Sequence, residues 1–458
     1  MYQTIKQVPL KYLKNTSWLF WERVLRLLMG LFVGAWVARY LGPEQFGLLS
    51  YVQSFVGLFI VLSTLGLDNI VVREIVKNTN IAASLIGTAF ILKLLGAIFM
   101  LLIITLTMTT LFEHDSSEKV LIFIVAFSTI FHSFNVIDYY FQSQVLSRYV
   151  VYANVLVLFV SSLTKIALII NEADLMAFVW VVLFDSVVLA LSYTWFFLKK
   201  TDYKIADLAL TFRKDVALSL LRDSWPLILS GLVISVYMKI DQVMIREMLD
   251  NEAVGQYAAA VKISTAWYFI PVVVASSFFP AIINARKISK DLYYERLQKL
   301  YDLNFTVALV LGLPVVFFSS SIIEILYGQD FTQSAAILSV HIFCGFLVFM
   351  GVVRGKWILS ENLQRYDLYI HVIAAVANIV FNFAFISWFG VIGAAYGTLL
   401  SYLFALFFSP LIIKEIRPSF SMILNGYKNV LTLKILKKEY FNGYICTVRM
   451  WKNLKKTQ

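Results

Sequence analysis

The feature that most constrains this chain is a series of long apolar segments separated by short polar ones. A membrane-spanning helix needs about 20 consecutive, mostly apolar residues, and twelve segments of the sequence meet this requirement. They cover residues 17–41, 44–66, 81–111, 119–141, 149–170, 175–198, 222–249, 253–279, 303–327, 333–360, 366–389 and 391–413. The pattern predicts an all-α polytopic membrane protein with about twelve transmembrane helices.

The connections between these segments alternate in charge, which predicts their orientation. Basic connections include KNTN after Val76, the segment 199–222, and ARKISKDLYYERLQK from Ala285. The connections between them are short and acidic, as in NEAD from Asn171 and DNE from Asp250. Because Lys and Arg are retained on the cytoplasmic side, both termini are expected in the cytoplasm.

The net charge of +11 would also suit a nucleic-acid-binding protein, but its distribution argues otherwise. Most of the excess lies in residues 414–458, after the last apolar segment. We expect this tail to be cytoplasmic and to contact anionic membrane lipids, which attract basic segments next to a transmembrane helix. No nucleic-acid partner is expected.

Two short stretches repeat at equivalent places in the chain. LGPEQFGLLSYVQSF, from Leu41, and LDNEAVGQYAAAVKI, from Leu249, share Leu, Glu and Gly at 41/249, 44/252 and 47/255. Both stretches open the second helix of a six-helix set, and an offset of six spans restores the same orientation. The chain is therefore expected to form two six-helix lobes related by an axis along the membrane normal, with a binding site between them. The predicted parts are an N-lobe at 1–198, a cytoplasmic linker at 199–222, a C-lobe at 223–413 and the basic tail at 414–458.

Several charged residues lie deep inside the predicted spans. Each costs about 2.5 to 3.5 kcal/mol at the middle of a membrane helix, so these side chains should face protein, water or one another. The cations are Lys239, Lys262, Arg23, Arg26 and Lys93, and the carboxylates are Asp241 and Asp185. One interpretation is an anion site in which the five cations bind a lipid pyrophosphate or an acidic sugar. The other is ion pairing inside one lobe, for example of Lys93 or Arg26 with Asp185 or Glu22.

The two lysines of the seventh and eighth spans are the leading candidates for an anion site. Lys239 and Lys262 are each about eleven residues from the turn near Asp250, which places both roughly 17 Å below it at 1.5 Å per residue. Lys239 also begins a polar stripe that continues with Gln242 and Arg246 at helical spacing. Asp241 points away from Lys239 and is expected to act as a helix partner or as an ion-coupling carboxylate.

Longer sequence blocks resemble a known family of transporters. They are ARYLGPEQFGLLSYVQSF from Ala38, LSTLGLDNIVVREI from Leu62, KIDQVMIREMLDNEAVGQYAAAVKI from Lys239 and FIPVVVASSFFPAI from Phe269. These blocks resemble the polysaccharide-biosynthesis, Wzx-type flippases of the MOP exporter superfamily, and the similarity covers nearly the whole chain in order.

The resemblance implies a MATE-like fold and a transport function. The expected activity is translocation of undecaprenyl-pyrophosphate-linked oligosaccharide across the bacterial inner membrane, for O-antigen, lipopolysaccharide, capsule or exopolysaccharide synthesis. The expected partners are this lipid-linked oligosaccharide, membrane lipids, and polysaccharide polymerase and chain-length machinery.

Other function classes find less support in the sequence. Catalytic and nucleotide-binding motifs such as HExxH, GxSxG and the Walker loop do not occur, so no ATP site, cofactor or metal is expected. Energy for transport would then come from the membrane potential, an ion gradient or the pull of downstream consumption, and all three stay open. An ion-coupled multidrug or small-molecule exporter of the same superfamily is the main alternative, and it should carry carboxylates and aromatic residues in its cavity. A membrane glycosyltransferase or polymerase would need a large outer loop, and a scaffold would leave the deep cations unexplained.

Overall fold

The computed structural model describes residues 2–110, 115–201 and 211–432, and for residues 2–14 and 16 it describes the backbone alone. These residues form helices and short connections, and the described part of the chain contains no strand. The all-α prediction is therefore confirmed. The predicted linker and basic tail lie partly outside the described residues, at 202–210 and 433–458.

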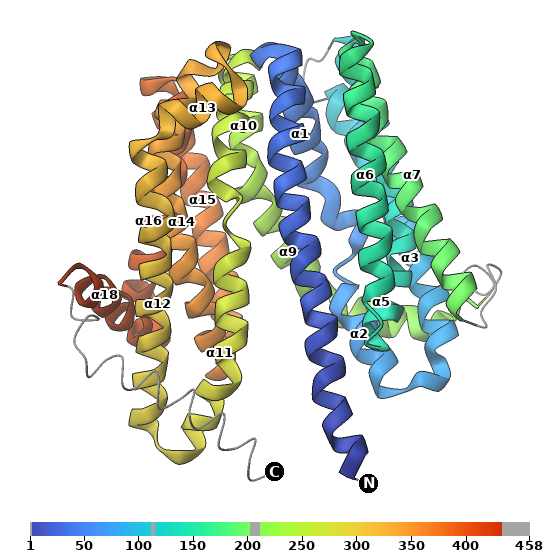
Figure 1. Ribbon diagram of the computed structural model, residues 1–458, viewed down its shortest axis with the longest axis vertical. Helices are drawn as coiled ribbons and strands as arrows, with labels where there is room; N and C mark the ends of the chain where they lie inside the picture. The colour runs from blue at the N-terminus through green and yellow to red at the C-terminus, as the bar shows by residue number, and fades with distance from the viewer. Residues whose placement is uncertain (1, 111–114, 202–210, 433–458) are drawn as a thin grey trace. The chain divides into compact units, whose positions relative to one another are not determined.

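The helices follow one another with few residues between them (Figure 1). The first half of the chain contains α1 (Tyr2–Thr64), α2 (Asp68–Lys77), η1 (Thr79–Ile81), α3 (Ala82–Thr110), α4 (Ser116–Ser128), η2 (Thr129–Asn135), α5 (Val136–Ser143), α6 (Arg148–Ile170) and α7 (Leu175–Lys200). The second half contains α9 (Lys214–Met248), α10 (Asn251–Thr265), α11 (Phe269–Ile288), α12 (Lys290–Phe317), α13 (Ser319–Tyr327), η3 (Gln329–Phe331), α14 (Thr332–Ser360), α15 (Gln364–Phe389), α16 (Val391–Leu403), a π-helical turn at Phe404–Phe408, α17 (Ser409–Ile412), η5 (Lys414–Ile416) and α18 (Arg417–Leu431).

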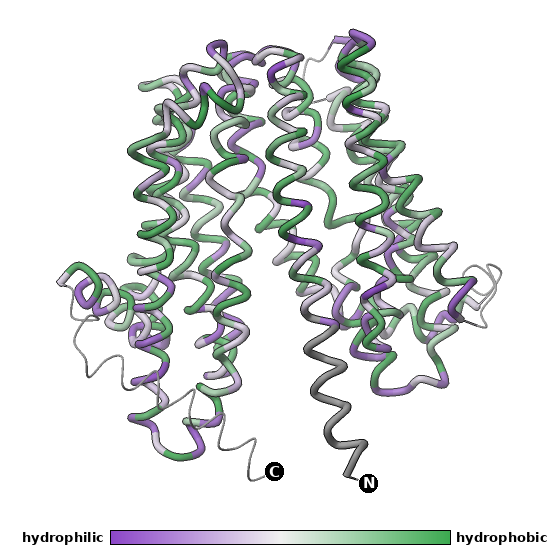
Figure 2. The backbone as a smooth tube through the Cα atoms, viewed as in Figure 1, coloured by the Kyte–Doolittle hydropathy of each residue, from purple (hydrophilic) through white to green (hydrophobic). Residues whose placement is uncertain are grey.

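Eleven helical stretches among the described residues are long and apolar enough to cross a membrane. Figure 2 shows hydrophobic residues along these helices and hydrophilic residues gathered near many of the turns. The first stretch, Ser17–Lys77, contains two of the twelve predicted spans. The chain is a multi-pass membrane protein.

The two predicted spans merge in α1 because the break between them is a single residue. Gly42 has φ 72° and ψ 170°, outside the helical region. Glycine tolerates this conformation because it has no Cβ. Pro43 follows, and proline suits the first position of the helix that resumes after it.

The predicted ninth span and the loop before it need correction. The basic stretch ARKISKDLYYERLQK is helical apart from Ser289, whose side chain accepts a hydrogen bond from the Leu292 amide and caps α12. An ion pair between Glu295 and Lys299, 2.5 Å apart, supports the extra turns. The ninth helix therefore runs from Lys290 to Phe317 rather than over 303–327, and its predicted end belongs to α13.

The described residues form two compact units. Unit 1 comprises the described residues within Met1–Ala259, Ile323–Ser334 and Ile386–Val391, and unit 2 comprises those within Ala260–Ile322, Ala335–Phe385 and Ile392–Gln458. The core of unit 1 includes Leu67, Ile137 and Phe197, and the core of unit 2 includes Leu297 and Trp357. Each unit is a group of residues that pack against one another. This division does not test the two six-helix lobes with a boundary at 199–222, which stay a prediction.

Candidate functional site

A polar cavity of about 350 Å³ lies within unit 1. Nine of its ten lining residues are polar, and Arg26, Asp68 and Asn69 among them are exposed, so the space is open to water or to a ligand. The lining residues are Arg26, Asp68, Asn69, Asn135, Asp138, Tyr139, Gln142, Asn154, Leu189 and Tyr193. We call this space the polar cavity.

A broken helix supplies one wall of the polar cavity. The long helix α1 ends at Thr64, and Leu65 and Gly66 have positive φ values of 52° and 60°. At Gly66 a Cβ atom would also stand only 2.9 Å from the Cβ of Leu227. The chain then restarts as α2, and its first two residues, Asp68 and Asn69, line the cavity.

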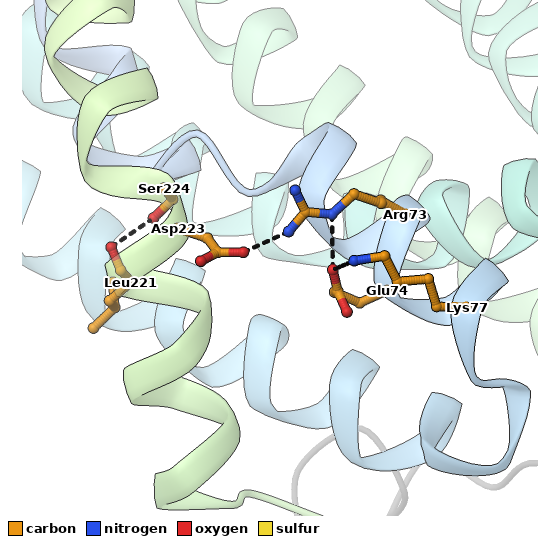
Figure 3. Close-up of polar contacts among 6 residues, drawn as sticks. All are labelled: Arg73, Glu74, Lys77, Leu221, Asp223 and Ser224. Carbon is orange, nitrogen blue, oxygen red and sulfur yellow. Dashed lines mark hydrogen bonds and ion pairs between the residues drawn. The ribbon is translucent and has the colours of Figure 1, made fainter.

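Polar contacts hold the C-terminal part of α2 against α9 (Figure 3). The guanidinium of Arg73 pairs with Asp223 of α9 and with Glu74, 2.7 Å away. Glu74 also pairs with Lys77 at 2.8 Å. The side chains of Arg73 and Asp223 are 48% and 43% exposed, so this pairing orients α2 more than it stabilises the fold.

A second interrupted helix supplies another wall. Between α4 and α5 the seven residues of η2 form a 3₁₀ helix, a conformation that rarely extends beyond three or four residues. The hydroxyls of Ser128, Thr129 and Ser133 donate to backbone carbonyls three residues earlier, an arrangement that competes with regular helix bonding. The interruption places Asn135 at the cavity, and α5 adds three more lining residues.

A buried lysine contacts two of the residues that line the cavity. Lys93 of α3 is fully buried, and its Nζ donates to the Tyr139 hydroxyl at 2.6 Å and lies 3.9 Å from Oδ1 of Asp68. The Tyr139 hydroxyl in turn donates to Asp68. Lys93 therefore does not line the cavity itself, but it contacts two residues that do, Tyr139 and Asp68.

Arg26 reaches the cavity but is already paired. Its Nε donates to Oε1 of Glu22 at 2.9 Å, as the four-residue spacing predicts. The cavity and these contacts together contain two cations, Arg26 and Lys93, and three carboxylates, Glu22, Asp68 and Asp138. The formal charge is thus one negative unit, which does not suit an anion such as pyrophosphate.

Some lining groups of the cavity have partners among the described residues, and others have none there. Asp138 accepts a hydrogen bond from Gln142 at 3.0 Å, and Asn154 accepts one from Tyr193 at 3.2 Å. The side-chain amides of Asn69 and Asn135 make no hydrogen bond with any residue that the structure describes. These two amides offer both donors and acceptors to a ligand.

The other predicted site residues have separate surroundings. Asp185 accepts a hydrogen bond from Ser161 at 2.7 Å and lies 3.6 Å from Lys165. Asp241 is buried and accepts a hydrogen bond from Tyr257 at 2.7 Å. Arg23 is exposed on α1. Both carboxylates therefore have partners within unit 1, and the partner of Asp185 is Lys165 rather than Lys93 or Arg26.

Lys239 of α9 differs from the other residues of its predicted stripe. Gln242 accepts a hydrogen bond from Ser54 at 2.7 Å, and Arg246 pairs with Glu118 at 2.9 Å, so both pack within unit 1. The aliphatic part of Lys239 lies along Gly57, where a Cβ would be 3.5 Å from Cγ of the lysine. Its ammonium group forms no hydrogen bond or ion pair with the described residues. Lys262 is half-buried on α10, in unit 2.

The repeated stretches meet in a reciprocal backbone contact within unit 1. A Cβ on Gly47 would stand 1.7 Å from the carbonyl oxygen of Asn251, and a Cβ on Gly255 would stand 2.0 Å from that of Pro43. The repeat equates Gly47 with Gly255 and Pro43 with Asn251, so each repeat makes the same contact with the other. We call these four residues the glycine contact.

Sequence reasoning did not identify Asp68, Asn69, Asn135, Asp138 or Tyr139 as site residues. The signals were LGLDN from Leu65, with a glycine next to two polar residues, and NVIDYY from Asn135, both near the ends of predicted spans. Within the described part of the chain, no group of three or more His, Cys, Asp or Glu residues is placed to hold a metal ion.

A protein-family comparison identifies the relatives of this chain. The family model described as "Polysaccharide biosynthesis protein" matches residues 12–286, which include most of unit 1 and the whole polar cavity. The chain belongs to this family. The resemblance seen in the sequence is thereby confirmed.

Two proteins of Haloferax volcanii are similar to this family member over part of its length. One is named "Probable flippase AglR" and is 30% identical over 177 residues, which cover 36% of this chain and 35% of the relative. The other is named "Probable low-salt glycan biosynthesis flippase Agl15" and is 26% identical over 170 residues, with the same two shares. The matched segment spans about a third of the length of each relative.

Solved structures show the fold of this family member. An inward-facing multidrug resistance MATE family transporter of the MOP superfamily has a TM-score of 0.70 and 16% identity, with 90% of this chain and 96% of that chain covered. The lipid II flippase MurJ in an inward closed conformation has a TM-score of 0.67 and 15% identity, with 93% of each chain covered. The protein therefore has a MOP-like fold.

Proposed function

We propose that this protein is a flippase that moves undecaprenyl-pyrophosphate-linked oligosaccharide across the bacterial inner membrane by alternating access. Both termini would lie in the cytoplasm. The product would supply surface polysaccharide synthesis, such as that of O-antigen or capsule, through polymerase and chain-length machinery. An ion gradient or the membrane potential would provide the energy.

The observation that carries this proposal is the environment of the Lys239 ammonium group, in a chain of the polysaccharide biosynthesis protein family. Its ammonium group has no ionic or hydrogen-bond partner among the described residues, although α9 is apolar enough to span a membrane. An intramembrane charge without a partner is costly and commonly marks a substrate pathway. A lipid pyrophosphate would provide the missing negative charge. Lys262 stays a proposed substrate-binding residue in its own right.

A second candidate function is export of small cationic compounds. The polar cavity contains Asp68 and Asp138 together with two tyrosines, which are the residue types that such an exporter needs. The MATE-like fold is compatible with this function. The pairing of Asp68 with buried Lys93 makes it the weaker candidate, because that carboxylate already has a cation beside it.

Deletion of the protein in its own host tests the proposal. A flippase mutant should accumulate lipid-linked oligosaccharide on the cytoplasmic face and lose surface glycan. Wild-type protein should restore both, whereas Lys239→Ala/Lys262→Ala at equal abundance should not. Lys77→Ala, on an exposed side chain, serves as the matched control and should restore both. Normal glycan with altered sensitivity to small cations would favour the exporter instead.

A further inference from the structure

The polar cavity of unit 1 and the Lys239 ammonium group offer different chemistry to a ligand. The cavity offers hydrogen-bonding groups with a formal surplus of negative charge, whereas Lys239 offers a positive charge without a partner in the described residues. One ligand that carries both an anionic and an uncharged polar part would match these two kinds of site. A lipid pyrophosphate attached to sugars is such a molecule.

The lining groups of the cavity match the hydrogen-bonding needs of a sugar. Each sugar hydroxyl is one donor and two acceptors, and each free carboxamide is two donors and one acceptor oxygen. Asn69 and Asn135 have such carboxamides without described partners, and Asp68 and Asp138 have carboxylates that accept from hydroxyls. The ring of Tyr193 and the side chain of Leu189 add apolar surface for the carbon face of a sugar ring.

The size and the construction of the cavity also suit a ligand. Its volume of about 350 Å³ lies at the lower end of the range for small-molecule pockets, roughly 300–1,000 Å³. Two interrupted helices build it, at Leu65–Gly66 and at η2. Discontinuous helices in transporters commonly form the substrate or ion site, because irregular backbone inside a membrane is tolerated where it lines a cavity.

The charges around the cavity argue against its other possible ligands. A pyrophosphate would meet the two lining carboxylates, Asp68 and Asp138, whereas the neighbouring cations Arg26 and Lys93 are already paired with Glu22 and Asp68. A small cation would compete with Lys93, whose ammonium group is held between Tyr139 and Asp68. A ligand without charge avoids both conflicts.

We propose that the polar cavity binds an uncharged sugar residue of the transported glycolipid, through the amides of Asn69 and Asn135 and the carboxylates of Asp68 and Asp138. The cavity is thus a glycan subsite that selects the sugar, while the pyrophosphate binds elsewhere. This inference rests on the proposed flippase function.

Binding of two lipids to the purified full-length protein tests the subsite. The probes are the lipid-linked oligosaccharide extracted from the source cells and undecaprenyl pyrophosphate, which carries no sugar, and both are titrated by native mass spectrometry. Asn69→Ala/Asn135→Ala should weaken binding of the oligosaccharide lipid by about tenfold, because each lost hydrogen bond accounts for a few-fold change. The same variant should bind undecaprenyl pyrophosphate as the wild type does.

Matched variants make the result specific. Gln333→Ala/Gln364→Ala removes two exposed carboxamides on α14 and α15 and should change neither affinity. Lys239→Gln should weaken binding of both lipids. If the double asparagine variant does not fold, Asn69→Ala alone, on an exposed side chain, should still weaken oligosaccharide-lipid binding by about threefold.

The outcomes separate the subsite from the flippase function. Unchanged oligosaccharide-lipid affinity in the asparagine variants overturns the subsite, and so does an equal loss of affinity for both lipids. If the wild-type protein binds neither lipid, the flippase proposal itself is wrong. If it binds both lipids equally and only Lys239→Gln weakens binding, the flippase proposal stands and the glycan subsite falls.

Discussion

The polar cavity and the glycine contact lie in the same compact unit, but the first is an open polar space and the second is a close contact between backbones. In the cavity, broken helices hold polar groups apart around an open volume of about 350 Å³. At the glycine contact, two helical segments approach so closely that a single added carbon would overlap a carbonyl oxygen. The difference teaches that polar side chains with free hydrogen-bonding capacity point to ligand binding, whereas glycines in backbone contact point to packing. Substitutions should therefore reduce ligand binding in the first region and stability in the second.

The largest effect is expected at the glycine contact. Gly47→Ala and Gly255→Ala would each place a Cβ about 2 Å from a backbone atom, which no side-chain movement can relieve. Each variant should destabilise the protein by about 3 kcal/mol or more, measured as a lower thermal unfolding midpoint in detergent.

Gly30→Ala in the same helix is the control for this prediction. A Cβ at Gly30 would meet no atom within 4 Å, and alanine favours a helix by up to about 1 kcal/mol over glycine. This variant should unfold at the same temperature as the wild type or a higher one. Equal unfolding midpoints for Gly30→Ala and Gly47→Ala would contradict the packing role of the glycine contact.

A smaller loss of stability is expected beneath the cavity, at Lys93. Lys93→Met removes the buried cation that hydrogen-bonds Tyr139 and lies beside Asp68, and it should cost about 2 to 3 kcal/mol. Thermal unfolding measures this effect. Lys77→Met, on a side chain that is 60% exposed, should stay within about 0.5 kcal/mol of the wild type. If Lys93→Met unfolds at the same temperature as the wild type, the contacts of Lys93 with Tyr139 and Asp68 do not stabilise the fold.

The ion pair between Arg246 and Glu118 should contribute less. The two side chains are 26% and 8% exposed and lie 2.9 Å apart. A double-mutant cycle with Arg246→Met and Glu118→Gln should give a coupling of about 1 to 2 kcal/mol. The exposed pair Arg213 and Asp215 should give no measurable coupling. Equal coupling in both pairs would show that burial does not strengthen the first one.

The smallest effect on stability is expected inside the cavity itself. Asn69→Ala removes no hydrogen bond with a described residue, so unfolding should change by no more than about 0.5 kcal/mol. The same variant should lower glycan binding. A large loss of stability without a loss of binding would assign Asn69 to packing and remove it from the proposed subsite.

Much of the fold could be predicted from hydrophobic segments alone. Nearly all predicted spans correspond to helices of the structure, because each helix must be long and apolar enough to cross the bilayer. The ninth span was misplaced because α12 continues through the charged residues from Lys290 to Lys299, where capping and ion pairing sustain a helix that hydropathy does not indicate.

The candidate site could be predicted only in part. Arg26 and Lys93 were singled out as deep cations, and the structure places one in the wall of the cavity and the other beneath it. Their partners depend on tertiary packing: Lys93 meets Tyr139, 46 residues away, and not Asp185. Asn69 and Asn135 carry no charge and lie beside helix breaks that hydropathy does not detect, so their place in one cavity was not foreseen.

Transport by the purified protein in liposomes tests the central claim most directly. The lipid-linked oligosaccharide of the source cells would be incorporated with the full-length protein, and the sugar exposed on the outer leaflet would be oxidised with membrane-impermeant periodate over time. The account predicts that wild-type protein brings the inner-leaflet glycan to the outer face, and that Lys239→Gln/Lys262→Gln and Asn69→Ala/Asn135→Ala slow this movement. Oxidation that stops at the outer-leaflet fraction with wild-type protein would contradict it.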